Sequence, residues 1–254
     1  MSSVQRRMQI FNILLEEKTV EINELVKQFN VSAMTIRRDL ALFEKQGLIT
    51  TNYGGAYINR GTATEPSFSL KTGQMMNKKK MIAREAAGMV KNGDSIIIDC
   101  GTTTLQLVHY IQDKRITVIT NSWMIVNHLQ ANHKIKLILA PGEYNETSAG
   151  VLSHMTVEFY NKFNADIVFM STQGFDIEKG ATVPNIEDAC VKRAILNAAS
   201  TTILMVGSEK LGESFLSKYA DVNQFDYIVT DSGADADYVE KIKKCGSKVI
   251  IAGE

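Results

Sequence analysis

The sequence predicts an α/β protein built from two domains, and two observations support that prediction. Residues 1–58 contain three amphipathic helical segments followed by a short hairpin, which is the pattern of a winged helix-turn-helix. The rest of the chain alternates short β-branched apolar runs with helical segments, as in a mostly parallel sheet covered on both faces. We therefore expect a winged helix-turn-helix domain at 1–58, a linker at 59–76 and a mostly parallel α/β domain at 77–254.

The elements of the N-terminal domain follow from apolar spacing and from capping residues. Apolar residues recur at helical spacing over 5–17 and 22–29, with a short extended piece between them. Ser32 follows a tight turn and is well placed to cap a third helix through its hydroxyl. That helix should end near Gly47, because glycine readily adopts the left-handed conformation that closes helices. The segment LITTNYGGAYI then predicts two short strands joined as a hairpin.

The C-terminal part begins after a stretch without periodicity at 59–74, which predicts a linker. Helical order resumes at about 77, and short apolar runs then predict buried strands: SIIIDC, ITVIT, IKLILA, DIVFMS, TTILMV, DYIVT and KVIIA. Helical segments are expected between them at about 103–112, 122–132, 153–163, 186–200 and 235–244. Ligands of such sheets bind at the carboxyl ends of the strands, so the loops there are the candidate site.

The composition excludes several classes of protein. The 254 residues carry 28 basic and 28 acidic side chains, and a net charge of zero argues against a protein that coats nucleic acid. No apolar run approaches the roughly 20 residues that span a bilayer, and the polar start MSSVQRR lacks a signal-peptide core, so we expect a cytoplasmic protein. Cys100, Cys190 and Cys245 lie far apart, which indicates buried or incidental thiols rather than disulfides or zinc ligands.

The third helix, within VSAMTIRRDLALFEKQGLI, combines a core stripe with a cationic face. At 100° per residue, apolar side chains within 36–43 share one sector, Arg38 lies roughly opposite, and Thr35 and Arg37 flank it. A merely solvated helix face would also carry paired arginines. The preceding helix, turn and cap and the following hairpin favour a recognition helix in the DNA major groove. Asp39 is best explained as a charge partner of nearby basic side chains.

The segment INELVKQFNVSAMTIRRDLALFEKQGLI, followed by YGGA, resembles the DeoR/GlpR-type family of bacterial transcriptional regulators. The resemblance implies that the side chains of four residues contact operator DNA: Ser32, Thr35, Arg37 and Arg38. The wing departs from the family pattern Arg-x-His-Gly-Gly, because this chain has Thr-Asn-Tyr-Gly-Gly there. Tyr53 either bonds a DNA phosphate through its hydroxyl or packs within the hairpin.

Polar side chains and glycines follow four of the predicted strands. The first loop, DCGTTT, offers backbone N–H groups and hydroxyls where a helix is expected to begin, an arrangement that binds phosphate. A threonine there could equally do no more than cap its own helix. Because these loops meet at one sheet edge, we expect a polar pocket for a small, hydroxylated, phosphorylated molecule. The candidates are Asp99, Gly101, Thr102, Thr103, Thr104, Asn121, Ser122, Gly142, Ser148, Gly174 and Asp176.

The C-terminal domain is similar to the effector domain of the same family, which is related to ribose-phosphate isomerases and glucosamine-phosphate deaminases. The resemblance rests on DCGTTT, TNS, EDACVKRAI, GSEKLG and DYIVTD. It implies that residues 102–104 hold a phosphate and that Asn121 and Ser122 line the sugar site. Lys192 and Lys210 would supply cationic contacts, although Lys192 could instead belong to a solvated helix face.

Three classes of function remain: a DNA-binding regulator, an enzyme, and a winged helix that binds only protein, which Arg37 and Arg38 disfavour. Isomerases of this fold need a carboxylate that moves a proton, and Asp99, Asp176 and Glu187 are candidates. However, the loop that resembles the enzyme motif DGADE has the sequence TQGFD here, and the amide of Gln173 cannot act as a base. We therefore expect no catalytic residue, metal or cofactor, and a repressor of carbohydrate-metabolism genes that is controlled by a phosphorylated sugar.

The expected partners follow from that function. They are double-stranded operator DNA, the phosphorylated sugar and further copies of the chain in a dimer or tetramer, since DNA half-sites are usually bound by paired helices. No membrane partner is expected. The alternative is a sugar-phosphate isomerase or deaminase that carries an accessory nucleic-acid-binding domain.

Overall fold

The computed structural model describes residues 1–59 and 61–253. The chain divides into two compact units, Met1–Gln74 and Met75–Glu254, which we call the N-terminal unit and the C-terminal unit. Arg60 of the expected linker and Glu254 of the expected C-terminal domain lie outside the described residues. Within 1–59 and 61–253, no helix is both long enough and apolar enough to cross a membrane.

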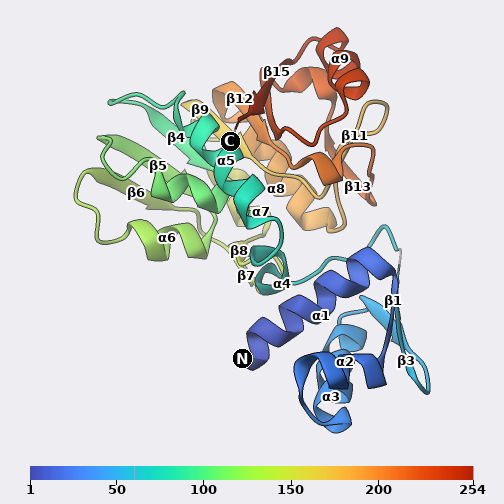
Figure 1. The fold of residues 1–254 in the computed structure, drawn as a ribbon. Helices are drawn as coiled ribbons and strands as arrows, with labels where there is room; N and C mark the ends of the chain where they lie inside the picture. Colours follow the sequence, from blue (N-terminus) through green and yellow to red (C-terminus); the bar gives the residue numbers. More distant parts are fainter. Residues whose placement is uncertain (60, 254) are drawn as a thin grey trace. The chain divides into compact units, whose positions relative to one another are not determined.

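The N-terminal unit has the order of helices and strands that the sequence predicts (Figure 1). Its elements are α1 (Ser3–Glu17), β1 (Thr19–Glu21), α2 (Ile22–Phe29), α3 (Ala33–Lys45), β2 (Ile49–Thr51) and β3 (Gly55–Ile58). Strand β3 lies between β1 and β2 and is antiparallel to both, so the wing is a small sheet. A short helix, α4 (Phe68–Thr72), lies in the segment expected to be an irregular linker, and the sequence pattern did not predict it.

One apolar cluster holds the N-terminal unit together. The rings of Phe11 in α1 and Phe43 in α3 lie 5.5 Å apart between centroids, and Leu25 of α2 is buried in the same cluster. Ile36 and Leu40 are buried there too, which confirms the predicted core face of α3. Burying such a side chain is favourable by roughly 1.5–3 kcal/mol relative to leaving it exposed. Packing therefore fixes the rotation of α3 about its axis and leaves the opposite face exposed.

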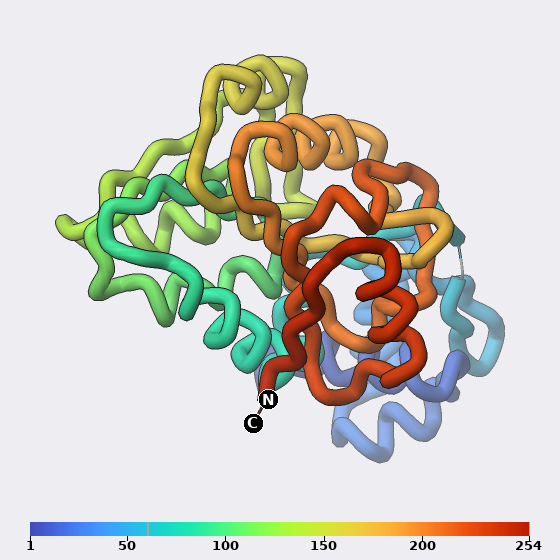
Figure 2. The backbone as a smooth tube through the Cα atoms, turned by 90° about the horizontal axis from the view of Figure 1, so that it is seen from above, coloured from blue at the N-terminus to red at the C-terminus, as the bar shows by residue number. Residues whose placement is uncertain are grey.

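Within the described residues, the C-terminal unit contains a seven-stranded sheet in the order β15-β14-β12-β9-β4-β5-β6, with every neighbouring pair parallel. From above, the green segment with β5 and β6 and the red segment with β14 and β15 lie on opposite sides of this unit (Figure 2). Each strand coincides with a predicted run: β4 (Ser95–Ile98), β5 (Ile116–Thr120), β6 (Ile135–Leu139), β9 (Ala165–Met170), β12 (Ala199–Met205), β14 (Tyr227–Asp231) and β15 (Lys248–Ala252).

Helices cover both faces of this sheet, because the chain must cross over between parallel strands. They are α5 (Met76–Ala87), the 3-10 helix η1 (Thr104–His109), α6 (Trp123–Leu129), α7 (His154–Tyr160), α8 (Ile186–Asn197) and α9 (Ala236–Lys244). Helix α5 packs on η1, whereas α8 packs on β9 and β12 with α7 beside it. Successive residues of β4 point to opposite faces, and Ile96, Ile97 and Ile98 are all fully buried, so the sheet is covered on both sides as predicted.

Several segments differ from the sequence prediction. The segment at 103–112 forms only the short 3-10 helix η1, and the helix expected at 186–200 ends at Asn197. Two loops expected to be irregular contain antiparallel hairpins: β7 (Tyr144–Asn145) with β8 (Gly150–Val151), and β10 (Gly174–Asp176) with β11 (Gly180–Val183), which also pairs with β13 (Ser217–Ala220). Both hairpins begin just after the carboxyl end of a parallel strand, so they flank the edge where the site is expected.

Candidate functional site

The N-terminal end of α3 is built by a capping interaction. The hydroxyl of Ser32 accepts a hydrogen bond from the backbone N–H of Thr35 at 3.2 Å, and the two hydroxyl oxygens lie 2.9 Å apart. The predicted cap is therefore confirmed. Both hydroxyls lie at the end of the helix whose residues contact base edges when a recognition helix enters the major groove.

The arginines of α3 and the aspartate that follows them point to different sides of the helix. Arg37 and Arg38 are exposed, and neither side chain forms a hydrogen bond or ion pair with another residue in the described part of the chain. Asp39 is only 4% exposed, and its Oδ2 lies 2.6 Å from Nε of Arg6, with Arg7 at 3.9 Å from Oδ1. Asp39 is thus a charge partner as predicted, but its partners belong to α1, so the positive charge of Arg37 and Arg38 remains available for DNA.

The wing has a rigid turn and an exposed tyrosine. Oδ1 of Asn52 accepts hydrogen bonds from the N–H groups two and three residues further on, at 3.1 and 2.7 Å. Thr51 donates through its hydroxyl and its N–H to Oε1 of Glu44, and these bonds hold the pKa of that carboxyl below its usual value while joining the wing to α3. The side chain of Tyr53 is 99% exposed, so the alternative that it packs within the hairpin is wrong.

The loop that follows β4 offers unused backbone donors. The N–H groups of Thr102 and Thr103 have no hydrogen-bond acceptor among the described residues, although both residues are buried. The hydroxyl of Thr104 instead donates to the backbone oxygens of Asp99 and Gly101, at 2.8 and 3.1 Å, so only its N–H remains for the predicted phosphate contact. Buried N–H groups without acceptors are rare, and an anion would satisfy them.

The loop after β5 lies against the loop after β4. Nδ2 of Asn121 lies 3.4 Å from Sγ of Cys100 and donates to the backbone oxygen of Val151 at 3.2 Å. Oδ1 of Asn121 is buried and has no partner within residues 1–59 and 61–253. Ser122 accepts a hydrogen bond from the N–H of Ile125, so it caps α6. The structure therefore brings these two predicted loops together.

The other predicted loop residues make local contacts. Oδ1 of Asp176 accepts hydrogen bonds from the N–H groups two and three residues further on, and Ser148 donates through its N–H to Oδ1 of Asn145. A Cβ on Gly142 would lie 2.3 Å from a hydroxyl oxygen, and one on Gly174 would lie 2.6 Å from a backbone oxygen. These four residues shape the two hairpins, and within the described part of the chain none of these contacts reaches the loop at 100–104.

Lys192 neither lies on a solvated helix face nor has a free ammonium for a ligand, which were the two interpretations of the sequence. Its side chain is 2% exposed, so the alternative of a solvated helix face is wrong, and its neighbour Arg193 takes the exposed position. Nζ lies 2.5 Å from Oδ2 of Asp99 and donates to the backbone oxygen of Ser171 at 3.1 Å. Oδ1 of Asp188, one helical turn earlier, lies 3.8 Å away. The ammonium expected to contact a ligand is therefore already bound to a carboxylate.

Lys210 lies at the edge of the sheet where the ligand is expected, next to the carboxyl end of β9. It ends the 3-10 helix η2 (Ser208–Lys210), which follows β12, and its Nζ donates to the backbone oxygen of Thr172 at 2.7 Å. Ser208 of the same helix contacts Lys78 of α5 at 2.8 Å and Asp231 at the end of β14 at 2.9 Å. Lys210 thus lies at the carboxyl edge of β9 and β12.

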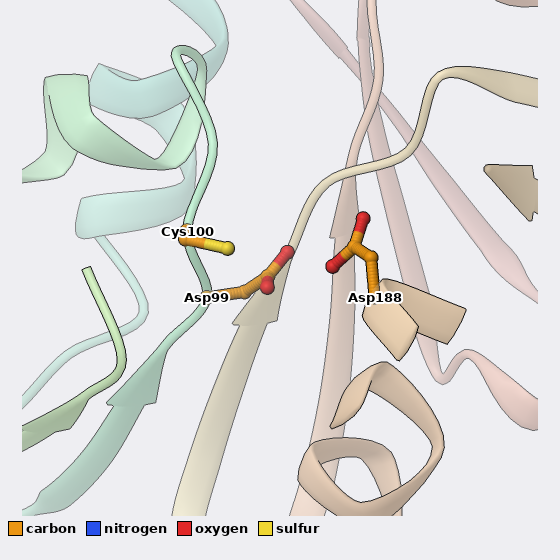
Figure 3. Close-up of side chains that lie close together, drawn as sticks. All are labelled: Asp99, Cys100 and Asp188. Atoms are coloured by element: carbon orange, nitrogen blue, oxygen red, sulfur yellow. The ribbon is translucent and has the colours of Figure 1, made fainter. Parts of the chain in front are cut away.

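Asp99, Cys100 and Asp188 point toward one another and are the described residues whose ligand atoms lie close enough to hold a metal ion (Figure 3). Burial raises the pKa of the Cys100 thiol well above its usual value, and the two carboxylates raise it further, which favours a protonated thiol rather than a thiolate ligand. Burial acts to lower the pKa of Lys192, but Asp188 and Asp99 outweigh it and hold this pKa well above its usual value. The cation of this cluster is therefore an ammonium, and we assign no metal to it.

Sequence reasoning missed three residues that surround Lys192. Asp188 had a signal, because it lies four positions before Lys192 on a predicted helix and such pairs are neighbours. Ser171 and Tyr219 had none, since one follows β9 and the other lies on β13, a strand that the pattern did not predict. The phenol of Tyr219 donates to the backbone oxygen of Ser171 at 3.0 Å, and burial raises its pKa.

Comparison with known proteins matches both parts of the chain. Residues 6–62 match the family model described as the DeoR-like helix-turn-helix domain, and residues 74–232 match the DeoR C terminal sensor domain. The uncharacterized HTH-type transcriptional regulator YulB of Bacillus subtilis (strain 168) is 33% identical, over 96% of this chain and 95% of its own length.

Two further proteins are similar to this chain. The glycerol-3-phosphate regulon repressor of Escherichia coli (strain K12) is 28% identical, over 91% of this chain and 92% of its own length. Among solved structures, ribose 5-phosphate isomerase A of Methanocaldococcus jannaschii aligns with 54% of this chain and 54% of its own at a TM-score of 0.40 and 15% identity.

Proposed function

The chain belongs to the DeoR family of transcriptional regulators, and on this premise we propose that its N-terminal unit binds operator DNA and represses carbohydrate-metabolism genes. A phosphorylated sugar bound by the C-terminal unit controls this binding. The ligand must favour one affinity state over the other, because a ligand that binds both equally shifts nothing. The boundary between the two units lies within the segment 59–76, which would carry the change from one unit to the other.

The exposed face of α3 is the observation that carries the DNA-binding proposal. Arg37 and Arg38 project from the unit without an acidic partner in the described residues, while the nearby acid Asp39 is bound to α1. Arginine can bond guanine edges or phosphates in pairs, which suits it to this position. Ser32 and Thr35 at the start of the helix, and Tyr53 on the wing, complete the proposed DNA contacts.

The experiment that tests this proposal is Arg38→Ala, with operator DNA obtained by selection from random sequences with the unmodified protein. We expect roughly a 5- to 150-fold loss of affinity, since one good bidentate contact to a base is worth about 1–3 kcal/mol. Arg115→Ala, which removes an exposed arginine of the C-terminal unit, is the matched control. If Arg38→Ala binds the operator DNA as tightly as the unmodified protein, α3 is not the recognition helix.

The loops at the carboxyl edge support a phosphorylated ligand. The free N–H groups of Thr102 and Thr103 suit an anion, and the unpartnered Oδ1 of Asn121 suits a hydroxyl donor. The Escherichia coli relative is named for the glycerol-3-phosphate regulon, which is consistent with a small phosphorylated polyol or sugar as the class of ligand. The other proposed effector contacts are Gly101, Ser122 and Lys210.

We propose that this site binds its ligand without turning it over. Asp99 is fully buried with its Oδ2 bound to Lys192 and Ser171, and Oδ1 of Asp176 accepts two backbone hydrogen bonds of its own turn. A carboxylate held in this way is poorly placed to remove a proton from a substrate. Gln173, which stands at the first position of the enzyme-like loop, cannot replace it.

The assembly and location follow from the proposed role. Operator half-sites are usually bound by paired recognition helices, so we propose that the chain acts as a homodimer or homotetramer. A repressor must reach the chromosome, so we also propose a cytoplasmic location.

A further inference from the structure

A group of buried polar residues lies beneath the loop at 100–104, and Lys192 is at its centre. We call this group the buried charge cluster, and it consists of Asp99, Ser171, Asp188, Lys192 and Tyr219. None of the five is more than 7% exposed. Nζ of Lys192 contacts Asp99 at 2.5 Å and Asp188 at 3.8 Å, and it lies 5.7 Å from the centroid of the Tyr219 ring.

The buried charge cluster joins four elements of the C-terminal unit. Asp99 follows β4, Ser171 follows β9, Lys192 and Asp188 lie on α8, and Tyr219 lies on β13. Ser171 donates through its N–H and its hydroxyl to Oδ2 of Asp99, at 3.1 and 3.2 Å. The backbone oxygen of Ser171 in turn accepts from both Lys192 and Tyr219. Lys192 therefore links α8 to the carboxyl ends of two neighbouring strands.

The loop at 100–104 rests on the cluster at two points. The hydroxyl of Thr104 donates to the backbone oxygen of Asp99 at 2.8 Å. A Cβ on Gly101 would lie 2.1 Å from Oγ of Ser171, so the loop backbone packs directly on that side chain. A displacement of Asp99 or Ser171 would move the loop and with it the free N–H groups of Thr102 and Thr103.

The charges of the cluster explain why Lys192 is not free to bind a ligand. Two carboxylates and one ammonium are buried together, and a buried carboxylate that loses its cation is strongly destabilised. If Lys192 moved to a ligand phosphate, it would leave Asp99 and Asp188 without that cation. The ammonium therefore remains with its carboxylates whether or not a ligand is present.

We propose that Lys192 is a positioning residue. It holds Asp99 and Ser171 in place so that the loop at 100–104 presents its N–H groups to the anionic part of the effector, and it does not contact the effector itself. The statement that the effector carries an anionic group rests on the proposed function. The statement that Lys192 orders the loop at 100–104 does not, and it is tested without any ligand.

Three variants of the full-length chain separate positioning from stability. Lys192→Met keeps the length of the side chain but leaves both carboxylates without an ammonium, so it is expected to fold poorly. The double variant Lys192→Met with Asp99→Asn removes the ammonium together with the carboxylate that it contacts at 2.5 Å, so only Asp188, at 3.8 Å from the ammonium, loses its cation. Lys218→Met, at a half-exposed lysine that pairs with Asp221, is the matched control.

The first measurement is hydrogen exchange without ligand. In the double variant we expect the amides of residues 100–106 to exchange at least tenfold faster, while those of β4 and β12 stay within twofold of the unmodified protein. Lys218→Met should exchange like the unmodified protein. If the loop amides of the double variant exchange at the unmodified rate, Lys192 does not order the loop and the proposal is overturned.

The second measurement is titration with inorganic phosphate, which probes the anion-binding part of the site. We expect the dissociation constant to rise at least tenfold in the double variant and to stay unchanged in Lys218→Met. Unchanged phosphate affinity in a double variant with a mobile loop would also overturn the proposal. If the unmodified protein binds no phosphate or sugar phosphate, the ligand half of the proposed function fails, and the exchange rates alone decide whether Lys192 orders the loop.

Discussion

Adjacent residues of this chain have opposite environments at two functional positions. Arg38 is exposed while Asp39 is buried, and Lys192 is buried while Arg193 is exposed. The reason is the same in both helices, because each step along an α-helix rotates the side chain by 100°. A pair of neighbouring charges can therefore serve an interior ion pair and an external surface at once.

The ion pair between Asp39 and Arg6 should be measurable as stability of the N-terminal unit. Asp39→Asn leaves the guanidinium of Arg6, which is only 11% exposed, without its carboxylate. We expect a loss of about 3–5 kcal/mol, because breaking a buried pair leaves an uncompensated charge. The loss of unfolding free energy is measured by urea titration, with hydrogen exchange at the amides of α1 and α3 as the signal.

Arg37→Ala is the control for that measurement, because it changes an exposed arginine of the same helix and should alter stability by less than about 0.5 kcal/mol. If Asp39→Asn is no less stable than Arg37→Ala, the contact between α1 and α3 does not depend on this pair.

The exposed residues of α3 could be predicted from the sequence, whereas the role of Lys192 could not. Helical spacing alone separates Ile36 and Leu40 from Arg37 and Arg38, since the two sets lie on different faces. Lys192 bonds to a carboxylate 93 positions earlier in the chain, and no local pattern reports such a contact. Lysine is also rarely buried unless it is paired with an acidic group, so the residue type alone predicted an exposed side chain at position 192.

Among the elements, the buried parallel strands were the easiest to predict and the short antiparallel ones the hardest. The central parallel strands are apolar on both faces and appear as nearly continuous runs rich in β-branched residues, whereas the edge strands β6 and β15 are partly exposed. Strands such as β7 and β8 contain two residues each, so they carry no periodicity. The 3-10 helix η1 resembles an α-helix in its sequence, because a six-residue segment does not distinguish the two spacings.

The wing provides a prediction for one element. A Cβ on Gly55 would lie 2.0 Å from the backbone oxygen of Val20, so Gly55→Ala must separate β3 from β1. We expect a loss of about 1–3 kcal/mol, which is the usual cost of forcing an extra group into a packed region. Thermal unfolding of the full-length chain measures it.

Gly54→Ala is the matched control for the wing, because a Cβ at that neighbouring position meets no atom within 4 Å. It should leave the unfolding temperature nearly unchanged. A Gly55→Ala protein as stable as Gly54→Ala would show that the close approach of β3 to β1 can relax without cost.

For the whole molecule, the two proposed binding functions lie in different compact units. Thr102 and Thr103 belong to the C-terminal unit, and Arg37 and Arg38 belong to the N-terminal unit. Control of one function by the other therefore requires two global states with different affinities for DNA and for ligand. Such coupling is reciprocal, so operator DNA must change the affinity for the ligand by the same factor.

This reciprocity gives a prediction for the intact protein. One member of a panel of pentose, hexose and triose phosphates should change operator affinity by about 5–150-fold, the usual range of allosteric coupling. Operator DNA should change the affinity for that compound by the same factor, as measured by titration in both directions. The compound should be recovered unchanged in a coupled turnover assay, and steady conversion would instead support the isomerase or deaminase alternative.

The seven parallel strands end at a single edge, and the loops there can change in length without altering the register of the sheet. Insertions and deletions in those loops are tolerated far better than changes in the strands that carry them. Descendants of one ancestral gene can therefore diverge in the metabolite that they sense while inheriting the same scaffold.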